Sequence, residues 1–395
     1  MAKGSATWKR VKFGEVVRLV KETCKDPAAA GIERVIGLEH IEPGDLRVRS
    51  WNDVADGTTF TTRARAGQVL FGKRRAYQRK VAVADFDAVC SGDIYVFESA
   101  DSERLLPELL PFICQTEAFF AHAVGTSAGS LSPRTNWSSL TQYELSLPPL
   151  QVQARLAGLL RCAESVRRSF EESCQAARAL RASFDEDFFR TAPAAWPRHP
   201  VSDLCEFFSR RHEASDRDHE CDAGHSGAVP VLRSLNVWPG WFDLADLRYL
   251  TPAGNAAQSK LQLRGGDLLI VRTGDAGRPG NAAVVPDSMQ GWNCLDLILA
   301  RPARAVRAGY LEAALNRRSS LQRLTSLAPG TKQKHLTMTE LHRLIVPLPP
   351  VLTQDAFLET RARLKAAEDC LLARLSAAMS NQKQLLSNAG GLSVY

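Results

Sequence analysis

The sequence lacks the features of a membrane or secreted protein. A membrane-spanning helix needs about 20 consecutive apolar residues, and no such run occurs. The N-terminal residues, MAKGSATWKR, lack the apolar segment of a secretory signal. Nine cysteines occur, an odd number, and none form a C-x-x-C pair, which argues against a disulfide framework and a zinc ribbon. We therefore expect a cytoplasmic protein with reduced cysteines and no membrane contact.

The short motifs of several enzyme classes are absent as well. The sequence has no G-x-x-x-x-G-K-[ST] phosphate loop, no H-E-x-x-H motif and no G-x-S-x-G elbow. An amino-methyltransferase needs an Asn/Asp-Pro-Pro-aromatic strip, and LPPL at 147–150 lacks its polar residue. We expect no catalytic residues, no bound cofactor and no enzymatic activity of this chain alone.

One segment contains several possible metal ligands. RHEASDRDHECDAGH carries His212, His219, Cys221 and His225. Neither C-x-x-C nor H-x-x-x-H spacing occurs in it, so an exposed, charged loop is the better interpretation and a metal site is the alternative.

The composition itself is that of a globular protein. The chain has 395 residues, of which 45% are hydrophobic and 24% charged, enough for two or three domains. Fifty basic against 43 acidic residues give a net charge of +7, which permits an anionic partner without requiring one. Phe60 to Lys80, FTTRARAGQVLFGKRRAYQRK, contains basic residues and no Asp or Glu. This run indicates a polyanion-binding surface, with a solvated strand and turn as the alternative.

The second half of the sequence repeats the first. Four pairs of segments recur in the same order: GQVLFGKRR from Gly67 with GDLLIVRTG from Gly266, CSGDIYVF from Cys90 with NCLDLILA from Asn293, Gly129–Leu140 with Gly330–Leu341, and LPPLQVQ from Leu147 with LPPVLTQ from Leu348. An internal repeat is interpreted before any local pattern, because it indicates the architecture of the whole chain. We interpret the chain as a duplicated unit.

Each half contains short β-branched or aromatic runs between turn residues, which predict strands. These are VLF, KVAVADF and DIYVF in the first half and DLLIV, AAVV and LDLIL in the second. Short helices are expected at 105–122 and 310–325. Together these patterns predict an α/β (α+β) fold.

After each proline pair the apolar period changes to three or four residues, which predicts a long helix. The first stripe includes Leu156, Leu159 and Val166, and the second repeats by seven from Phe357 to Leu385. We expect two antiparallel coiled-coil helices that bury these stripes against each other and hold the globular units at opposite ends. The expected boundaries are 1–150 and 193–350 for the globular domains, 151–192 and 351–388 for the helices, and 389–395 for a tail.

The ordered double occurrence of the LPPL-x-x-Q and LPPV-x-x-Q junctions, with Gln153 and Gln354 in register, resembles the specificity (S) subunit of type I restriction-modification systems. The resemblance covers Trp8 to about Leu386. It implies two target recognition domains that each read one half of a bipartite site in double-stranded DNA. It also implies that the helices dock DNA methyltransferase subunits, and two such subunits are expected. Association with a restriction subunit is a further possibility that the resemblance implies. S-adenosylmethionine and ATP with Mg²⁺ would belong to those partners.

Phosphates are neutralised by Lys and Arg, while base edges are read by Arg, Asn and Gln. In the first domain we expect phosphate contacts from the basic run and base contacts from the loop SLSPRTNW; the candidates are Lys73, Arg74, Arg75, Tyr77, Arg79, Lys80, Arg134, Asn136 and Trp137. In the second domain the candidates are Arg272, Thr273, Arg278, Asn281, Lys332, Gln333, Lys334 and His335. A capping turn with a packed Trp is the alternative for the first loop, and simple turns are the alternative for the glycines of GDAGRPGN.

The sequence therefore leads to a hypothesis and two rivals. The hypothesis is a non-catalytic DNA-recognition subunit. The rivals are a protein-binding scaffold and, less favoured, a stand-alone nuclease. The charged faces of the two helices suit partner docking, and their apolar stripes suit packing.

Overall fold

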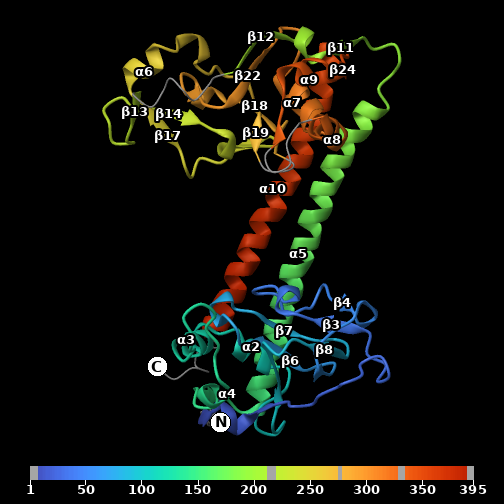
Figure 1. Ribbon diagram of the computed structural model, residues 1–395, viewed down its shortest axis with the longest axis vertical. Coiled ribbons are helices and arrows are strands. Elements are labelled where there is room, and N and C mark those ends of the chain that lie inside the picture. Colours follow the sequence, from blue (N-terminus) through green and yellow to red (C-terminus); the bar gives the residue numbers. More distant parts are fainter. Residues whose placement is uncertain (1–7, 211–218, 275–277, 328–333, 389–395) are drawn as a thin grey trace, which may run out of the picture. The chain divides into compact units, whose positions relative to one another are not determined.

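The computed structural model describes residues 8–210, 219–274, 278–327 and 334–388 (Figure 1). Its contacts divide the chain into two units. Unit 1 comprises the residues up to Glu171 and those from Ala373 onwards, and unit 2 comprises Glu172–Leu372. Two long helices, α5 (Leu150–Arg190) and α10 (Val351–Asn388), each contribute residues to both units.

Unit 1 is built on two four-stranded sheets. The first has the antiparallel order β2-β9-β6-β7. The second has the order β4-β3-β8-β5, in which β3 and β8 run parallel. The strands are β1 (Lys9–Lys12), β2 (Val17–Leu19), β3 (Arg34–Ile36), β4 (Asn52–Asp53), β5 (Thr62–Ala64), β6 (Val69–Gly72), β7 (Val81–Val83), β8 (Ala88–Cys90), β9 (Ile94–Ser99) and β10 (Glu144–Leu147). Strands β1 and β10 pair and lead the chain into α5.

Unit 2 repeats this framework. Its first sheet has the order β12-β22-β18-β20, and its second has the order β13-β17-β14-β21 with β14 and β21 parallel. The strands are β11 (Arg198–Pro200), β12 (Cys205–Arg210), β13 (Glu220–Cys221), β14 (Val229–Leu232), β15 (Val237–Trp238), β16 (Trp241–Phe242), β17 (Arg248–Leu250), β18 (Leu268–Val271), β19 (Thr273–Gly274), β20 (Ala282–Val284), β21 (Asn293–Cys294), β22 (Leu297–Pro302), β23 (Lys334–His335) and β24 (Ile345–Pro347). The described units differ at the edge of the second sheet, where unit 1 adds β5 beyond β8 and unit 2 adds β13 beyond β17.

The predicted α/β class and the internal repeat are confirmed, and all six predicted strands are present. Helices are present in both segments where short helices were expected, 105–122 and 310–325, and each segment is divided into two helices. In unit 1 the segment forms α2 (Leu110–Cys114) and α3 (Glu117–Gly125), because Thr116 has an extended backbone and its hydroxyl accepts a hydrogen bond from the Phe119 amide. In unit 2 it forms α7 (Ala308–Asn316) and α8 (Arg318–Leu327). The other helices are α1 (Phe13–Val16), α4 (Trp137–Leu140), α6 (Pro252–Ala256) and α9 (Met338–His342).

The long helices run antiparallel within each unit. In unit 2 the Phe357 ring of α10 lies 5.4 Å from Phe184 and 4.4 Å from Phe188 of α5. In unit 1 Leu385 and Leu386 of α10 pack against the core that includes Ala157 and Leu160. The coiled-coil pair is therefore confirmed.

The expected apolar stripe of α5 was partly wrong. Leu159 and Val166 are 46% and 49% exposed. The buried line is shifted by one position and contains polar side chains, among them Arg167, while Glu368 and Gln382 are buried on α10. Paired charged groups and amides therefore occupy helix positions at which the periodicity predicted only apolar contacts.

No helix of the described residues is long and apolar enough to cross a membrane.

Candidate nucleic-acid interface

The basic run of unit 1 forms an unusual turn after β6. Arg75 and Arg79 have φ values of 53° and 58°, in the left-handed region that residues other than glycine seldom adopt. They flank the short helical turn Ala76–Gln78, which leaves Tyr77 53% exposed. The third described non-glycine residue with positive φ is Asp296 of unit 2, which lies between β21 and β22. Such backbone conformations concentrate at functional sites.

The structure brings together the two candidate segments of unit 1. The Arg75 amide donates to the Pro133 carbonyl at 2.7 Å, and the Thr135 amide donates to the Lys73 carbonyl at 3.0 Å. Asp93 accepts from Arg134 Nε at 2.9 Å and from an Arg74 Nη at 3.3 Å. Arg74 and Arg134 therefore share one carboxylate.

Asp93 remains ionised in this position. Burial raises its pKa, but the hydrogen bonds and charges of Arg134 and Arg74 outweigh burial, so the pKa lies below its ordinary value. The carboxylate thus orients two arginines while neutralising only part of their charge.

Unit 2 repeats this arrangement with other residues. Arg272, directly after β18, donates to Asp296 at 3.2 Å, and its carbonyl accepts from the Leu336 amide at 2.8 Å. The Thr273 hydroxyl and His335 Nδ1 lie 3.1 Å apart, across the β19–β23 pair. Asp296 in NCLD occupies the position of Asp93 in CSGD, so the same acidic position binds an arginine beside the crossing in both units.

Most arginines of the basic run Phe60–Lys80 are paired with acids from other segments. The run Phe60–Lys80 has no acidic residue of its own, but the fold supplies acids from distant segments. Four arginines are paired in this way: Arg63 with Asp87, Arg65 with Glu22, Arg74 with Asp93 and Arg79 with Glu117. Seven basic residues therefore face only four partner carboxylates, which leaves an excess of positive charge.

The other basic residues of this run have different environments. Lys73 Nζ lies 4.7 Å from the centre of the Tyr95 ring, and Lys80 Nζ donates to the Leu38 carbonyl at 2.6 Å. Arg75 is partly buried, and its Nε lacks a hydrogen-bond partner. Within the described chain no carboxylate pairs with these three side chains.

The remaining candidates vary in accessibility. Trp137 packs against Phe97 at 5.5 Å and Phe13 at 6.1 Å, which favours the packing alternative. Asn136 is exposed at the start of α4 and makes no capping bond. Asn281 is buried. Arg278 donates to the Ser234 and Val237 carbonyls at 2.5 and 3.1 Å.

Lys332 and Gln333 lie outside the described residues, as does His212 of the possible metal segment. Lys334 is placed only as a residue of β23. Among the described residues no group of three or more His, Cys, Asp or Glu is arranged to hold a metal ion.

Sequence reasoning noted the register of Gln153 and Gln354 without giving them a role. Gln153 is 1% exposed; its amide accepts from the Leu106 amide at 2.9 Å and donates to the Arg104 and Pro148 carbonyls. Gln354 is 0% exposed and repeats all three bonds with Arg307, Ala305 and Pro349. Each junction thus ties the first turn of a long helix to its own globular domain.

Comparison with known proteins agrees with this architecture. No family model matches the chain. It is 26% identical over 149 residues to the type I restriction enzyme EcoDI specificity subunit of Escherichia coli, a match covering 37% of this chain and 32% of that protein. The match therefore spans about a third of the relative's length.

Two solved structures have the same fold. One is a chain from a study of complex assembly and conformational transition of the type I R-M system, with a TM-score of 0.65 and 17% identity over 100% of this chain and 99% of that one. The other is the type I restriction-modification S subunit of M. genitalium, with a TM-score of 0.57 and 12% identity over 100% and 98%. The resemblance stated from the sequence is confirmed.

Proposed function

We propose that this chain, which has the fold of the type I restriction-modification S subunits, is the sequence-specific DNA-recognition subunit of such a complex. Units 1 and 2 each read one half of a bipartite site, and α5 and α10 dock methyltransferase subunits. The chain itself carries out no chemistry. S-adenosylmethionine, and ATP with Mg²⁺ where a restriction subunit is present, are bound by the partners in the cytoplasm.

The observation that carries this proposal is the duplicated crossing of two candidate loops. Asp93 binds Arg74 and Arg134 in unit 1, and the matching Asp296 binds Arg272 in unit 2, each close to non-glycine residues with left-handed backbone. The side chains around the crossings differ, since Lys73 and Arg74 of unit 1 correspond to Arg272 and Thr273 of unit 2. The two units thus share a backbone framework but carry different side chains at the crossing, as expected if they read two different half-sites.

The decisive experiment is to sequence methylated positions in cells with and without the gene. We expect one split motif to lose its adenine methylation when the gene is deleted. Purified alone, the chain should bind DNA weakly and methylate nothing; with a methyltransferase subunit and S-adenosylmethionine it should modify that motif. A complex that methylates without sequence preference would contradict the proposal.

Salt dependence separates this proposal from a protein scaffold. DNA binding that neutralises phosphates falls steeply with added salt, with a logarithmic slope of roughly 0.9 per phosphate contacted. DNA binding without such a slope, or metal-dependent cleavage by the isolated chain, would favour the rival functions.

A further inference from the structure

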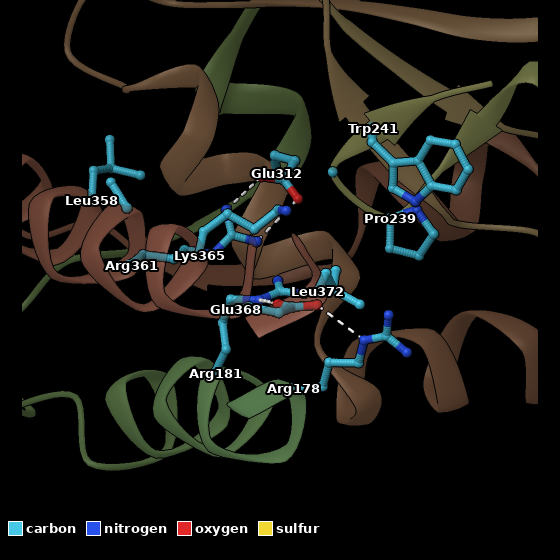
Figure 2. Close-up of a pocket in the computed structure, with 12 residues that line it drawn as sticks. Arg178, Arg181, Pro239, Trp241, Glu312, Leu358, Arg361, Lys365, Glu368 and Leu372 are labelled. Atoms are coloured by element: carbon cyan, nitrogen blue, oxygen red, sulfur yellow. Dashed lines mark hydrogen bonds and ion pairs between the residues drawn. The ribbon is translucent and has the colours of Figure 1, made fainter. Parts of the chain in front are cut away.

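A cavity of about 650 Å³ in unit 2 lies outside the candidate interface (Figure 2). Its walls come from α10, the C-terminal part of α5, Glu312 of α7, and the hairpin formed by β15 and β16. Figure 2 shows Arg178 and Arg181 of α5 on one side, and Pro239 and Trp241 of the hairpin on another.

Two arginines of this cavity keep unused hydrogen-bond donors. Glu368 is buried, with 6% of its side chain exposed, and accepts from the Nε atoms of Arg178 at 3.0 Å and Arg181 at 3.1 Å. Together with Arg361, which Asp185 and Glu312 share, these side chains carry three positive and three negative charges and balance one another. Their Nη atoms have no hydrogen-bond partner among the described residues.

The neighbouring Arg361 is different, because its guanidinium is shared between Asp185 and Glu312. Arg178 and Arg181 are therefore the available anion donors of this wall.

The opposite wall is aromatic and extends to a candidate DNA residue. Trp241 is 52% exposed and stacks on Trp238, with ring centres 5.7 Å apart and planes at 12°. The Arg278 guanidinium lies 4.3 Å from the centre of the Trp238 ring. A continuous path of cationic and aromatic groups therefore links the cavity to Arg278.

The corresponding place in unit 1 is filled by the protein's own carboxylate. The turn Pro43-Gly44 matches Pro239-Gly240, and both glycines have positive φ. The next residue is Asp45 in unit 1, where it is buried 3.9 Å from Arg167, and Trp241 in unit 2. Arg167 stands where Glu368 does, in the register that aligns Gln153 with Gln354. In unit 1 the turn therefore presents a carboxylate to an arginine of the long helix, whereas in unit 2 the turn presents an exposed ring, and the carboxylate Glu368 lies on the helix.

We propose that the unit 2 cavity binds a backbone phosphate of DNA, with Arg178 and Arg181 as donors and Trp241 packing on the adjoining sugar or base. This inference rests on the proposed function and extends the DNA contact from the second recognition domain onto α5. A phosphate suits the site because guanidinium groups bind it through paired donors and an exposed ring stacks on a nucleotide. The path to Arg278 favours DNA over an acidic protein segment.

The test is the salt dependence of DNA binding by the full chain, assembled with its methyltransferase subunits. Removing the arginines alone would strand the buried Glu368, so the main variant is R178Q/R181Q/E368Q. We expect its logarithmic salt slope to fall by about 0.9 to 1.8, for one or two lost charges at phosphates. E368Q alone keeps both guanidinium groups and should keep the slope.

Met379 and Gln382 occupy the equivalent positions of α10 in unit 1, so M379A/Q382A is the matched control and should also keep the slope. An unchanged slope in the triple variant, with or without weaker methyltransferase binding, overturns the inference in favour of no ligand or a protein partner. Absence of salt-dependent DNA binding by the wild type would instead overturn the proposed function.

Discussion

The buried glutamine at each junction gives the sharpest prediction about the fold. Replacing Gln354 with Met keeps the length of the side chain and removes all its hydrogen bonds. The Arg307 amide and the Ala305 and Pro349 carbonyls then lose their partner. Because Gln354 is fully buried, water does not readily replace these bonds.

The expected cost follows from this geometry. Three hydrogen bonds with a net contribution of about 1 kcal/mol each give a loss of about 3 kcal/mol in the free energy that holds the junction closed. Gln153→Met should cost a similar amount, because Gln153 makes the same three bonds with Leu106, Arg104 and Pro148.

Hydrogen exchange followed by mass spectrometry measures this effect locally. A loss of about 3 kcal/mol corresponds to roughly a hundredfold faster exchange of the protected amide. Gln354→Met should accelerate exchange around Arg307, and Gln153→Met around Leu106. Gln151→Met is the matched control, since Gln151 is exposed on the same helix turn as Gln153. Unchanged exchange at both junctions would refute the argument that these amides hold the helices to their domains.

Three further predictions concern charged groups. Arg361→Met should destabilise unit 2 by about 3–5 kcal/mol in urea unfolding, because Asp185 and Glu312 would remain buried without their counter-ion; a loss below 1 kcal/mol would contradict this. Asp93 has a pKa below its ordinary value of 3.8, so its contribution to stability is present above that pH and is lost as the pH falls through the lowered value. Asp93→Asn should therefore reduce the change in melting temperature between about pH 4 and pH 2, and an identical pH profile would argue against it. Arg74→Ala and Arg75→Ala should weaken binding to all DNA sequences, whereas Arg134→Ala or Arg272→Ala should relax preference at one base pair by about 1–3 kcal/mol, measured by competition with site variants; equal effects from both kinds of change would tell against this division.

The sequence by itself determined the architecture. The repeated segments, the β-branched and aromatic runs and the proline pairs are local or near-local signals, so they identified six of the strands, both long helices and the duplication. Hydrophobic periodicity was less reliable on the helices. Leu159 and Val166 satisfied the stripe but are exposed, whereas Arg167 and Glu368 are buried because each is neutralised by oppositely charged side chains.

Only the tertiary structure decided how the candidate residues are paired. The acids that neutralise the run Phe60–Lys80 come from distant parts of the chain, and so does the carboxylate that joins Arg74 to Arg134. The difference between Asp45 in unit 1 and Trp241 in unit 2 can likewise be interpreted only from the helix residues that lie near each of them. A sequence pattern records which groups a segment carries; the distances that set electrostatic energies arise when separate segments are folded against each other.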